Sequence, residues 1–352
     1  MVLNPPLVII LFLQVWRFQV LAAQVPLTVS NFMVPTRTGR APFTISSNGE
    51  EAETFFMVFG DLQSSERVPL VVSHGGGGTH HYLKSLSRLT EENSIPVILY
   101  DQLGFGLSTH FPDQAGNTSF WTVDVLVEQL IELIKFLGIE ERYDFLGHSF
   151  GTVFGIELAS RPEAEAGAAT ALRNRHRIRA GLRKLVLWSP CGSVELMDEM
   201  LKRRRTKLPE DVREALEKNE ANGTTDSEEY KNARMAQMHL DFCRLESWPN
   251  DLLESFSYSS KDGDAALTLF GNNPLETTGT IKDWSARKSA KHIAVPTLLL
   301  NGYYDWSDEA TEPLLWDIPV VRWVTFSNSS HLLHFEEPER FMDMVSNWLI
   351  RD

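Results

Sequence analysis

Short apolar runs alternate with segments of helical periodicity along most of the chain. This alternation is typical of a mostly parallel β-sheet flanked by helices, so the sequence predicts an α/β fold. The predicted strands are residues 68–72, 96–100, 143–146, 184–188, 297–300 and 322–326. The clearest predicted helices are residues 122–137, 151–160 and 338–349.

One long segment, residues 191–284, departs from this rhythm. It contains no strand-like run and is polar, charged and helical in pattern, most clearly at residues 209–220 and 251–256. Because it stands between two predicted strands, we expect a helical cap inserted into an α/β core. That core consists of residues 24–190 and 285–352.

A second irregular segment, residues 162–180, is rich in Ala and Arg. It shows no periodic apolar stripe that could pack on a sheet. We therefore expect a surface insertion in the core.

The N-terminal residues 1–23 predict export. Residues 7–16 form an apolar stretch of signal-peptide length, too short to span a bilayer, and small residues follow at 22–23. A secreted or secretory-pathway glycoprotein is therefore expected, and an intracellular protein or one anchored by an uncleaved N-terminal segment is the alternative. The predicted glycosylation sequons begin at Asn117, Asn222 and Asn328.

Charge and cysteine content exclude several classes of function. The formal net charge of −14 repels phosphate backbones and anionic lipid, so we expect neither a nucleic acid nor a stable membrane partner. The one basic run, residues 202–207, is interpreted as a solvated helix face. Cys191 and Cys243 are too few for a multi-cysteine metal site, and they form either one bridge or two buried thiols.

Ser149 carries the first sign of chemistry. It lies between Gly147 and Gly151, after one predicted strand and before a predicted helix. This is the setting of a nucleophile elbow, in which a serine on a tight strand-to-helix turn projects its hydroxyl above the sheet.

A nucleophilic serine needs a base and a group that orients that base, in the chain order serine, acid, histidine. Asp305 follows the predicted strand at 297–300, and His331 follows the one at 322–326. Both therefore fall at carboxyl ends of neighbouring strands, where open α/β sheets place their sites. Asp308 or Glu309 is the rival acid, and His334 is the rival base.

The oxyanion of the tetrahedral intermediate needs backbone N–H donors. The glycine-rich run at residues 74–78 directly follows a predicted strand and could supply one donor, and the N–H of Phe150 the other. The alternatives are a flexible loop or a phosphate-binding loop. A phosphate-binding loop would require a Lys-Ser/Thr pair, which this run lacks.

With these motifs located, the chain from about residue 69 onward resembles the proline iminopeptidases of peptidase family S33, within the α/β-hydrolase fold. Residues 74–78 look like the family's His-Gly-Gly-Pro-Gly motif, and residues 101–108 look like its Asp-Gln-x-Gly-x-Gly-x-Ser motif. Residues 147–151 match its elbow. Residues 278–284 are similar to the stretch that leaves the cap in tricorn-associated aminopeptidases.

The resemblance implies a catalytic triad and an oxyanion hole at matching positions. The triad would be Ser149, Asp305 and His331. The oxyanion donors would be the backbone N–H groups of Gly76 and Phe150.

The resemblance also implies an anion in the cap that holds the α-ammonium of the substrate. Residues 244–249 resemble the cap motif Arg-x-Glu-x-Trp-Pro, which makes Glu246 the substrate-binding candidate; a solvated surface glutamate is the alternative. His239 matches a cap histidine of the same motif.

Several positions depart from the family pattern. Asp241 stands where a second cap histidine is expected, and Pro274 stands where an acidic residue is expected, with Glu276 nearby but out of register. Gly77 replaces the proline of the oxyanion motif, and the insertion at 162–180 is foreign to the family. These departures bear on substrate specificity and leave the triad intact.

The sequence therefore predicts a serine hydrolase that acts through an acyl-enzyme, as an aminopeptidase or amidase that releases an N-terminal amino acid. The expected substrate is a small peptide or a small-molecule amide or ester, and the chemistry needs no metal or organic cofactor. One alternative is an esterase, lactonase or amidase acting on a molecule without a free amine. A non-catalytic binding protein on a hydrolase fold is the other. The sequence sets no oligomeric state.

Overall fold

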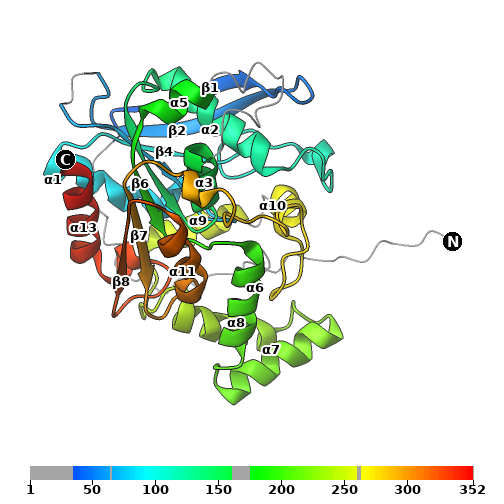
Figure 1. Cartoon of the computed structure of the whole chain (residues 1–352). Coiled ribbons are helices and arrows are strands. Elements are labelled where there is room, and N and C mark those ends of the chain that lie inside the picture. Colours follow the sequence, from blue (N-terminus) through cyan, green and yellow to red (C-terminus); the bar gives the residue numbers. More distant parts are fainter. Residues whose placement is uncertain (1–34, 64–65, 161–174, 260–262, 352) are drawn as a thin grey trace.

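In a computed structural model, which describes residues 35–63, 66–160, 175–259 and 263–351, one eight-stranded sheet runs through the molecule (Figure 1). The strand order is β1-β2-β4-β3-β5-β6-β7-β8. In this order, the six strands from β4 onward, β3 included, are parallel to one another. At the other edge, β1 pairs antiparallel with β2, and β2 pairs antiparallel with β4. The strands are β1 (Arg37–Thr44), β2 (Glu51–Phe59), β3 (Leu70–Ser73), β4 (Val97–Tyr100), β5 (Tyr143–His148), β6 (Leu182–Trp188), β7 (Thr297–Gly302) and β8 (Val321–Phe326).

The predicted mostly parallel sheet is confirmed, because all six predicted strands occur within two residues of their expected starts. The hairpin of β1 and β2 was not predicted. Both strands alternate buried and exposed positions over much of their length, whereas β3, β4 and β5 are buried throughout. A strand buried on both faces shows as a continuous apolar run, and an edge hairpin does not.

Helices cover both faces of the sheet. On one face, α2 (Val123–Leu137) and α3 (Gly151–Ser160) pack against side chains such as Val71 of β3. On the other face, neighbours of Val71 on the same strand pack against a second group of helices. That group is η1 (His80–Ser87), α1 (Arg88–Asn93) and α13 (Pro338–Ile350).

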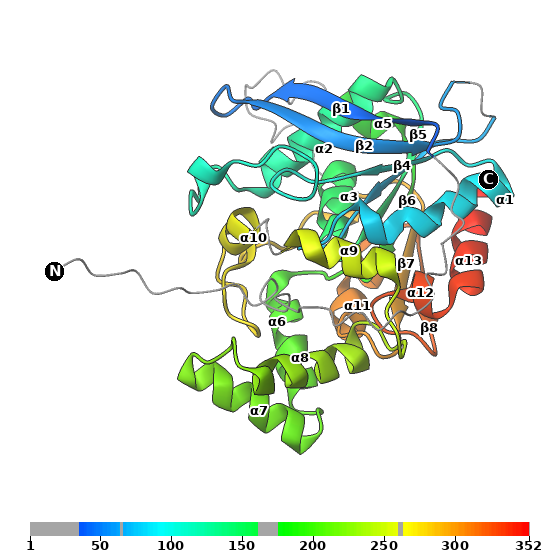
Figure 2. The same ribbon diagram turned by 180° about the vertical axis from the view of Figure 1, so that it is seen from behind.

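Five α-helices lie between β6 and β7 in the described part of the chain. Figures 1 and 2 show α7 and α8 at the end of the molecule opposite the β1–β2 hairpin, with α6 between them and the sheet. We refer to this segment, residues 191–284, as the cap. Its helices are α6 (Val194–Arg205), α7 (Glu210–Asn222), α8 (Glu228–Asp241), α9 (Asn250–Ser259) and α10 (Gly263–Phe270).

The basic run at the end of α6 is not simply a solvated face. Arg205 is buried, and Arg204 donates to the carbonyl of Asp305 at 2.5 Å. Each of the four basic residues of this run that lie within α6 pairs with a carboxylate. The pairs are Lys202–Glu276, Arg203–Glu309, Arg204–Asp308 and Arg205–Glu220.

Other predicted features have mixed outcomes. Within the predicted insertion at 162–180, residues 162–174 lie outside the described residues, but the end of the segment forms α5 (Arg175–Gly181), with Ile178 buried. Cys191 and Cys243 are both free thiols. Residues 1–23 lie outside the described residues, among which no helix is long and apolar enough to span a membrane. The other helices of the described residues are η2 (Pro112–Gln114), α5 (Arg175–Gly181), η4 (Ala290–His292), α11 (Asp308–Asp317) and α12 (Leu333–Glu336).

Candidate active site

The turn between β5 and α3 holds Ser149 in a strained conformation. Its φ of 53° lies in the left-handed region that non-glycine residues rarely adopt, and its N–H donates to the Trp188 carbonyl at 2.8 Å. The flanking glycines are required by space. A Cβ at Gly147 would lie 2.4 Å from the Gly151 oxygen, and one at Gly151 would lie 2.5 Å from the Ser73 oxygen. The turn therefore has the form of a nucleophile elbow.

Asp305 and His331 lie at the carboxyl ends of β7 and β8, which are parallel neighbours. Backbone hydrogen bonds join the two loops that carry them. Tyr303 donates to the Phe326 carbonyl at 2.9 Å, and Tyr304 donates to the Ser329 carbonyl at 3.0 Å. The sheet therefore brings together two residues that are far apart in the sequence.

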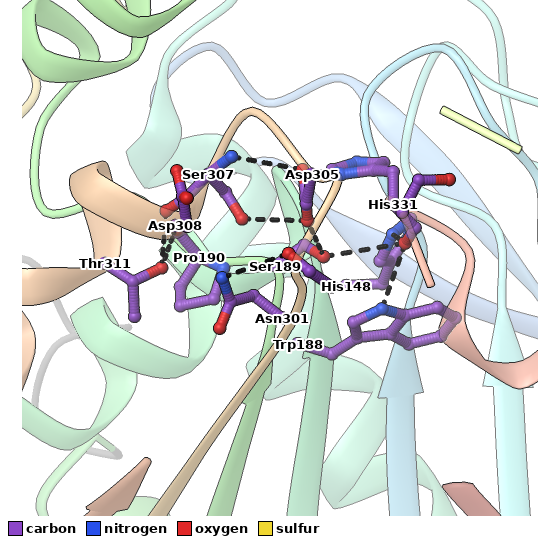
Figure 3. A network of polar contacts seen from close by, with 12 residues as sticks. His148, Trp188, Ser189, Pro190, Asn301, Asp305, Ser307, Asp308, Thr311 and His331 are labelled. Carbon is purple, nitrogen blue, oxygen red and sulfur yellow. Dashed lines mark hydrogen bonds and ion pairs between the residues drawn. The ribbon is translucent and has the colours of Figure 1, made fainter. Parts of the chain in front are cut away.

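The carboxylate of Asp305 accepts a hydrogen bond from Nδ1 of His331 at 2.9 Å. Figure 3 shows Asp305 between His331 and the hydroxyls of Ser189 and Ser307. Ser307 donates its N–H to Oδ1 at 3.1 Å and its hydroxyl to Oδ2 at 2.8 Å, and Ser189 also donates to Oδ2. Burial raises the pKa of Asp305, but the His331 charge and these hydrogen bonds outweigh burial and hold that pKa below its ordinary value. An ionised, oriented carboxylate results.

The rival residues have other partners. The carboxylates of Asp308 and Glu309 pair with arginines of α6. The ring of His334 is buried, and its Nε2 donates to the Tyr82 carbonyl at 2.8 Å. Of the candidate acids and bases, only Asp305 and His331 pair with each other in the described structure.

The glycine-rich loop at residues 74–78 passes directly against the serine. A Cβ at Gly75 would lie 3.1 Å from Cβ of Ser149. The loop is held by Gln102, whose side-chain amide donates to the His74 carbonyl at 2.7 Å and whose N–H donates to Nε2 of His74 at 3.0 Å. Burial lowers the pKa of His74 to about 4, so the ring is neutral and Nε2 can accept. The motif at residues 101–108 thus contributes a support for the loop.

Gly76 and Phe150, the two predicted oxyanion donors, line the same cavity as Ser149. The N–H of Gly75 has another role, because it donates to the hydroxyl of Tyr82 at 2.7 Å. The N–H of Gly75 is therefore already used, and Gly76 stays the candidate oxyanion donor of this loop.

The cavity is enclosed mainly by apolar side chains and has a volume of about 130 Å³. Phe270, at the end of α10, covers the oxyanion side: its ring centroid lies 4.9 Å from that of Phe150, and a Cβ at Gly76 would lie 2.6 Å from its ring. Trp306 stacks on His331 with 5.0 Å between ring centroids. The apolar lining includes Val153, Met197, Leu201, Met238, Phe242 and Phe256.

Charged residues from the cap also line this cavity. Asp198 is largely buried, and its carboxylate accepts from the N–H and the hydroxyl of Thr277 at 2.9 and 3.0 Å. Burial raises the pKa of Asp198. Glu276 pairs with Lys202 at 3.8 Å, and Arg234 donates to a glutamine of its own helix. Two carboxylates therefore border a mainly apolar space.

The structure does not bring Glu246 and His239 to this site. Neither lines the cavity in the part of the chain that the structure describes, and Glu246 is exposed. The reason lies in Trp248, whose indole N–H donates to the Cys243 carbonyl at 3.0 Å and whose ring packs on His239 and Phe256. The tryptophan takes the inward position of this segment, and the glutamate points outward.

The carboxylates that do border the cavity were missed in the sequence. Asp198 belongs to a mainly polar helix in which no pattern distinguishes it. Glu276 lies near the position where the family pattern has an acidic residue, but not at that position. Among the described residues, no group of three or more His, Cys, Asp or Glu side chains is arranged to hold a metal ion.

Known proteins are similar to this chain in both sequence and fold. A family model for the alpha/beta hydrolase fold matches residues 68–338. The chain belongs to the α/β-hydrolase family, on the branch of the proline iminopeptidases. It is 32% identical to the proline iminopeptidase of Heyndrickxia coagulans over 283 residues, 80% of this chain and 90% of the relative.

Solved structures agree with this family. The crystal structure of VinJ matches with a TM-score of 0.78 and 36% identity, covering 90% of this chain and 99% of VinJ. The proline iminopeptidase of Mycobacterium smegmatis matches with a TM-score of 0.76 and 30% identity, covering 89% of this chain and 97% of that structure. The resemblance predicted from the motifs is therefore confirmed.

Proposed function

We propose that this chain is a serine aminopeptidase that releases a small N-terminal residue, such as proline or alanine, from a peptide or amide. The observation that carries the proposal is that Ser149 and His331 line one mainly apolar cavity, that Asp305 is hydrogen-bonded to His331, and that two carboxylates of the cap border the same cavity. The similarity to proline iminopeptidases supports the same class of reaction.

The reaction proceeds through an acyl-enzyme. Oγ of Ser149 attacks the scissile carbonyl while His331 accepts its proton, and the N–H groups of Gly76 and Phe150 bind the resulting oxyanion. Collapse breaks the C–N bond, and His331 gives its proton to the leaving amine. Water, deprotonated by the same imidazole, then attacks the ester and restores the serine. Asp305 orients the ring and stabilises its charged form.

The α-ammonium of the substrate is held by the carboxylates at the cavity wall. Asp198 keeps lone pairs on both oxygens after accepting from Thr277, so it can accept from an ammonium as well. Glu276 adds a second negative charge beside it. This anchor takes the role that the sequence resemblance gave to Glu246.

Substrates with and without a free amine test the proposal. We expect prolyl or alanyl arylamides to be hydrolysed and their N-acetylated forms to be poor substrates. A charge-assisted hydrogen bond contributes about 1.5–3 kcal/mol, so Asp198→Asn should raise KM for the free-amine substrates about ten- to a hundredfold. Glu246→Gln is the matched control and should leave KM unchanged.

Other outcomes would point to a different substrate. If aryl esters are hydrolysed and arylamides are not, the protein is an esterase or lactonase and not an aminopeptidase. The mainly apolar lining of the cavity is also compatible with such substrates. Equal turnover of free and N-acetylated arylamides would contradict the proposal that the carboxylates bind the α-ammonium of the substrate. Absence of all turnover and all labelling by a fluorophosphonate would leave a binding protein.

We also propose that the protein enters the secretory pathway and is glycosylated. The support is the apolar N-terminal pattern and the exposure of all three sequon asparagines, Asn117, Asn222 and Asn328. N-terminal sequencing of secreted material should find a start near residue 24, and glycosidase treatment should lower its mass. Retention in the cell with an intact N-terminus would contradict this proposal.

A further inference from the structure

A chain of buried hydrogen bonds runs along the cavity wall, from the glycine-rich loop to the backbone carbonyl of His331. The N–H of Gly75 donates to the hydroxyl of Tyr82 at 2.7 Å, and this hydroxyl lies 2.7 Å from Nδ1 of His148. On the other side of its ring, Nε2 of His148 lies 3.2 Å from the carbonyl of His331. The chain therefore joins the two sides of the site that must act together.

The chain has one consistent set of proton positions. Burial, with smaller contributions from neighbouring histidines, lowers the pKa of His148 well below its ordinary value, so the ring is neutral and carries one N–H. The carbonyl of His331 can only accept, which places that hydrogen on Nε2. Nδ1 must then accept from the hydroxyl of Tyr82, and the hydroxyl oxygen accepts from Gly75.

Neighbouring residues fix both ends of the chain. His334 donates to the backbone carbonyl of Tyr82 at 2.8 Å, so Tyr82 is held through its main chain and its side chain. The indole N–H of Trp188 donates to the carbonyl of His331 at 3.1 Å, beside the donor from His148 (Figure 3). Movement of the tyrosine or of the histidine ring would break several buried hydrogen bonds at once.

We propose that Tyr82 and His148 are a positioning pair that keeps the oxyanion loop in place relative to the main chain of His331. Both side chains line the cavity, but in the described structure neither hydrogen-bonds to Ser149 or to the ring of His331. By accepting from the N–H of Gly75, Tyr82 fixes the His74–Gly75 peptide, which directly precedes the peptide that carries the N–H of Gly76, the candidate oxyanion donor. The pair rests on the proposed serine chemistry and does not depend on which acyl group the enzyme accepts.

Variants of the pair test this role. Tyr82→Phe removes only the hydroxyl, and His148→Leu removes both ring nitrogens. His148→Gln restores an acceptor for Tyr82 and a donor for His331 in one amide. The control is Tyr143→Phe, which removes a buried hydroxyl that donates to the Ile178 carbonyl at 2.9 Å, at the far end of β5 from the site.

Two rates are measured for each folded variant: kcat with KM for an aryl ester or arylamide, and the rate of phosphonylation of Ser149 by a fluorophosphonate. Complete loss of one oxyanion donor costs about 10²- to 10³-fold in kcat, so a displaced donor should cost about 10- to 100-fold. Tyr82→Phe and His148→Leu should lower kcat and phosphonylation by this factor and leave KM within about threefold. His148→Gln should recover most of the loss. The double variant of Tyr82 and His148 should be no slower than the slower single variant, because both belong to one chain.

Several results would overturn the pair. These are a kcat of Tyr82→Phe within about twofold of the wild type, additive losses in the double variant, or an equal loss in Tyr143→Phe. A wild-type enzyme that is phosphonylated but hydrolyses no substrate in the panel disproves only the proposed substrate class, since the labelling rates still decide on the pair. A wild-type enzyme that resists phosphonylation overturns the pair together with the serine chemistry.

Discussion

Replacing Asp305 with asparagine removes one negative charge from the site and preserves the shape of the side chain. The backbone N–H of Ser307 can only donate at the Oδ1 position, so the amide oxygen takes that position and still accepts from Nδ1 of His331. The amide nitrogen takes the Oδ2 position, where the hydroxyls of Ser189 and Ser307 can rotate and accept. The imidazole therefore keeps its hydrogen on Nδ1, and the variant loses the charge alone.

The expected cost follows from the charge that forms during catalysis. Two opposite unit charges about 4 Å apart attract by about 4 kcal/mol at an effective dielectric constant of about 20. Because a neutral hydrogen bond from His331 to the amide oxygen remains, we expect a loss of about 3–4 kcal/mol of transition-state stabilisation. Each 1.36 kcal/mol corresponds to about tenfold in rate, so kcat for Asp305→Asn should fall about 10²- to 10³-fold.

The assay measures kcat at saturating substrate for the wild type, for Asp305→Asn and for Asp308→Asn as a matched control. Asp308 pairs with Arg204 at 3.4 Å, and its variant should stay within about threefold of the wild type. An Asp305→Asn enzyme within threefold of the wild type would refute the role of this carboxylate. A loss of about 10⁴-fold or more would show that the amide turns around and reverses the tautomer of His331, against the reasoning from Ser307.

Three further predictions concern stability. Burial lowers the pKa values of His74, His81 and His334 to about 4, 3 and 3. Below the ordinary histidine pKa of 6.5, these three side chains therefore bind protons in the unfolded chain but not in the folded chain. Their contribution to the free energy of unfolding, measured by urea titration, should fall by up to about 4 kcal/mol per pH unit between about pH 6 and pH 5. An unchanged free energy across this window would contradict the prediction. Gly151→Ala places a Cβ 2.5 Å from a backbone oxygen. It should lower the free energy of unfolding by about 1–3 kcal/mol and remove most of the activity. A fully active variant would be inconsistent with the tight turn. Asp144→Ala removes the buried carboxylate to which Arg183 donates twice and leaves that guanidinium only its bond to the Leu349 carbonyl. It should cost about 2–3 kcal/mol in chemical denaturation, and a loss below about 1 kcal/mol would show that the pair stabilises little.

The sequence was most informative where strands are buried on both faces. Residues 68–72 and 96–100 appear as uninterrupted apolar runs because helices cover both sides of the sheet there. The hairpin of β1 and β2 escaped prediction because one face of each strand is largely exposed and its polar residues interrupt the apolar pattern.

Some residues of the site could be predicted from the sequence, and others could not. The placement of Ser149, Asp305 and His331 near one another could be predicted because each lies in the turn or loop after a strand, and parallel strands end at the same edge of the sheet. The acidic wall could not, because Asp198 and Glu276 come from different parts of the cap and no spacing in the sequence relates them. The packing of side chains within the cap decides which carboxylates reach the cavity, and that packing is visible only in three dimensions.

Mass spectrometry of the covalently labelled enzyme tests the central claim most directly, since that claim is that Ser149 is the nucleophile. After reaction with a fluorophosphonate, the wild-type protein should carry a single adduct that maps to the peptide containing Ser149, and Ser149→Ala should carry none. An adduct of equal yield in Ser149→Ala, or one that maps to another residue of the wild type, would contradict the account.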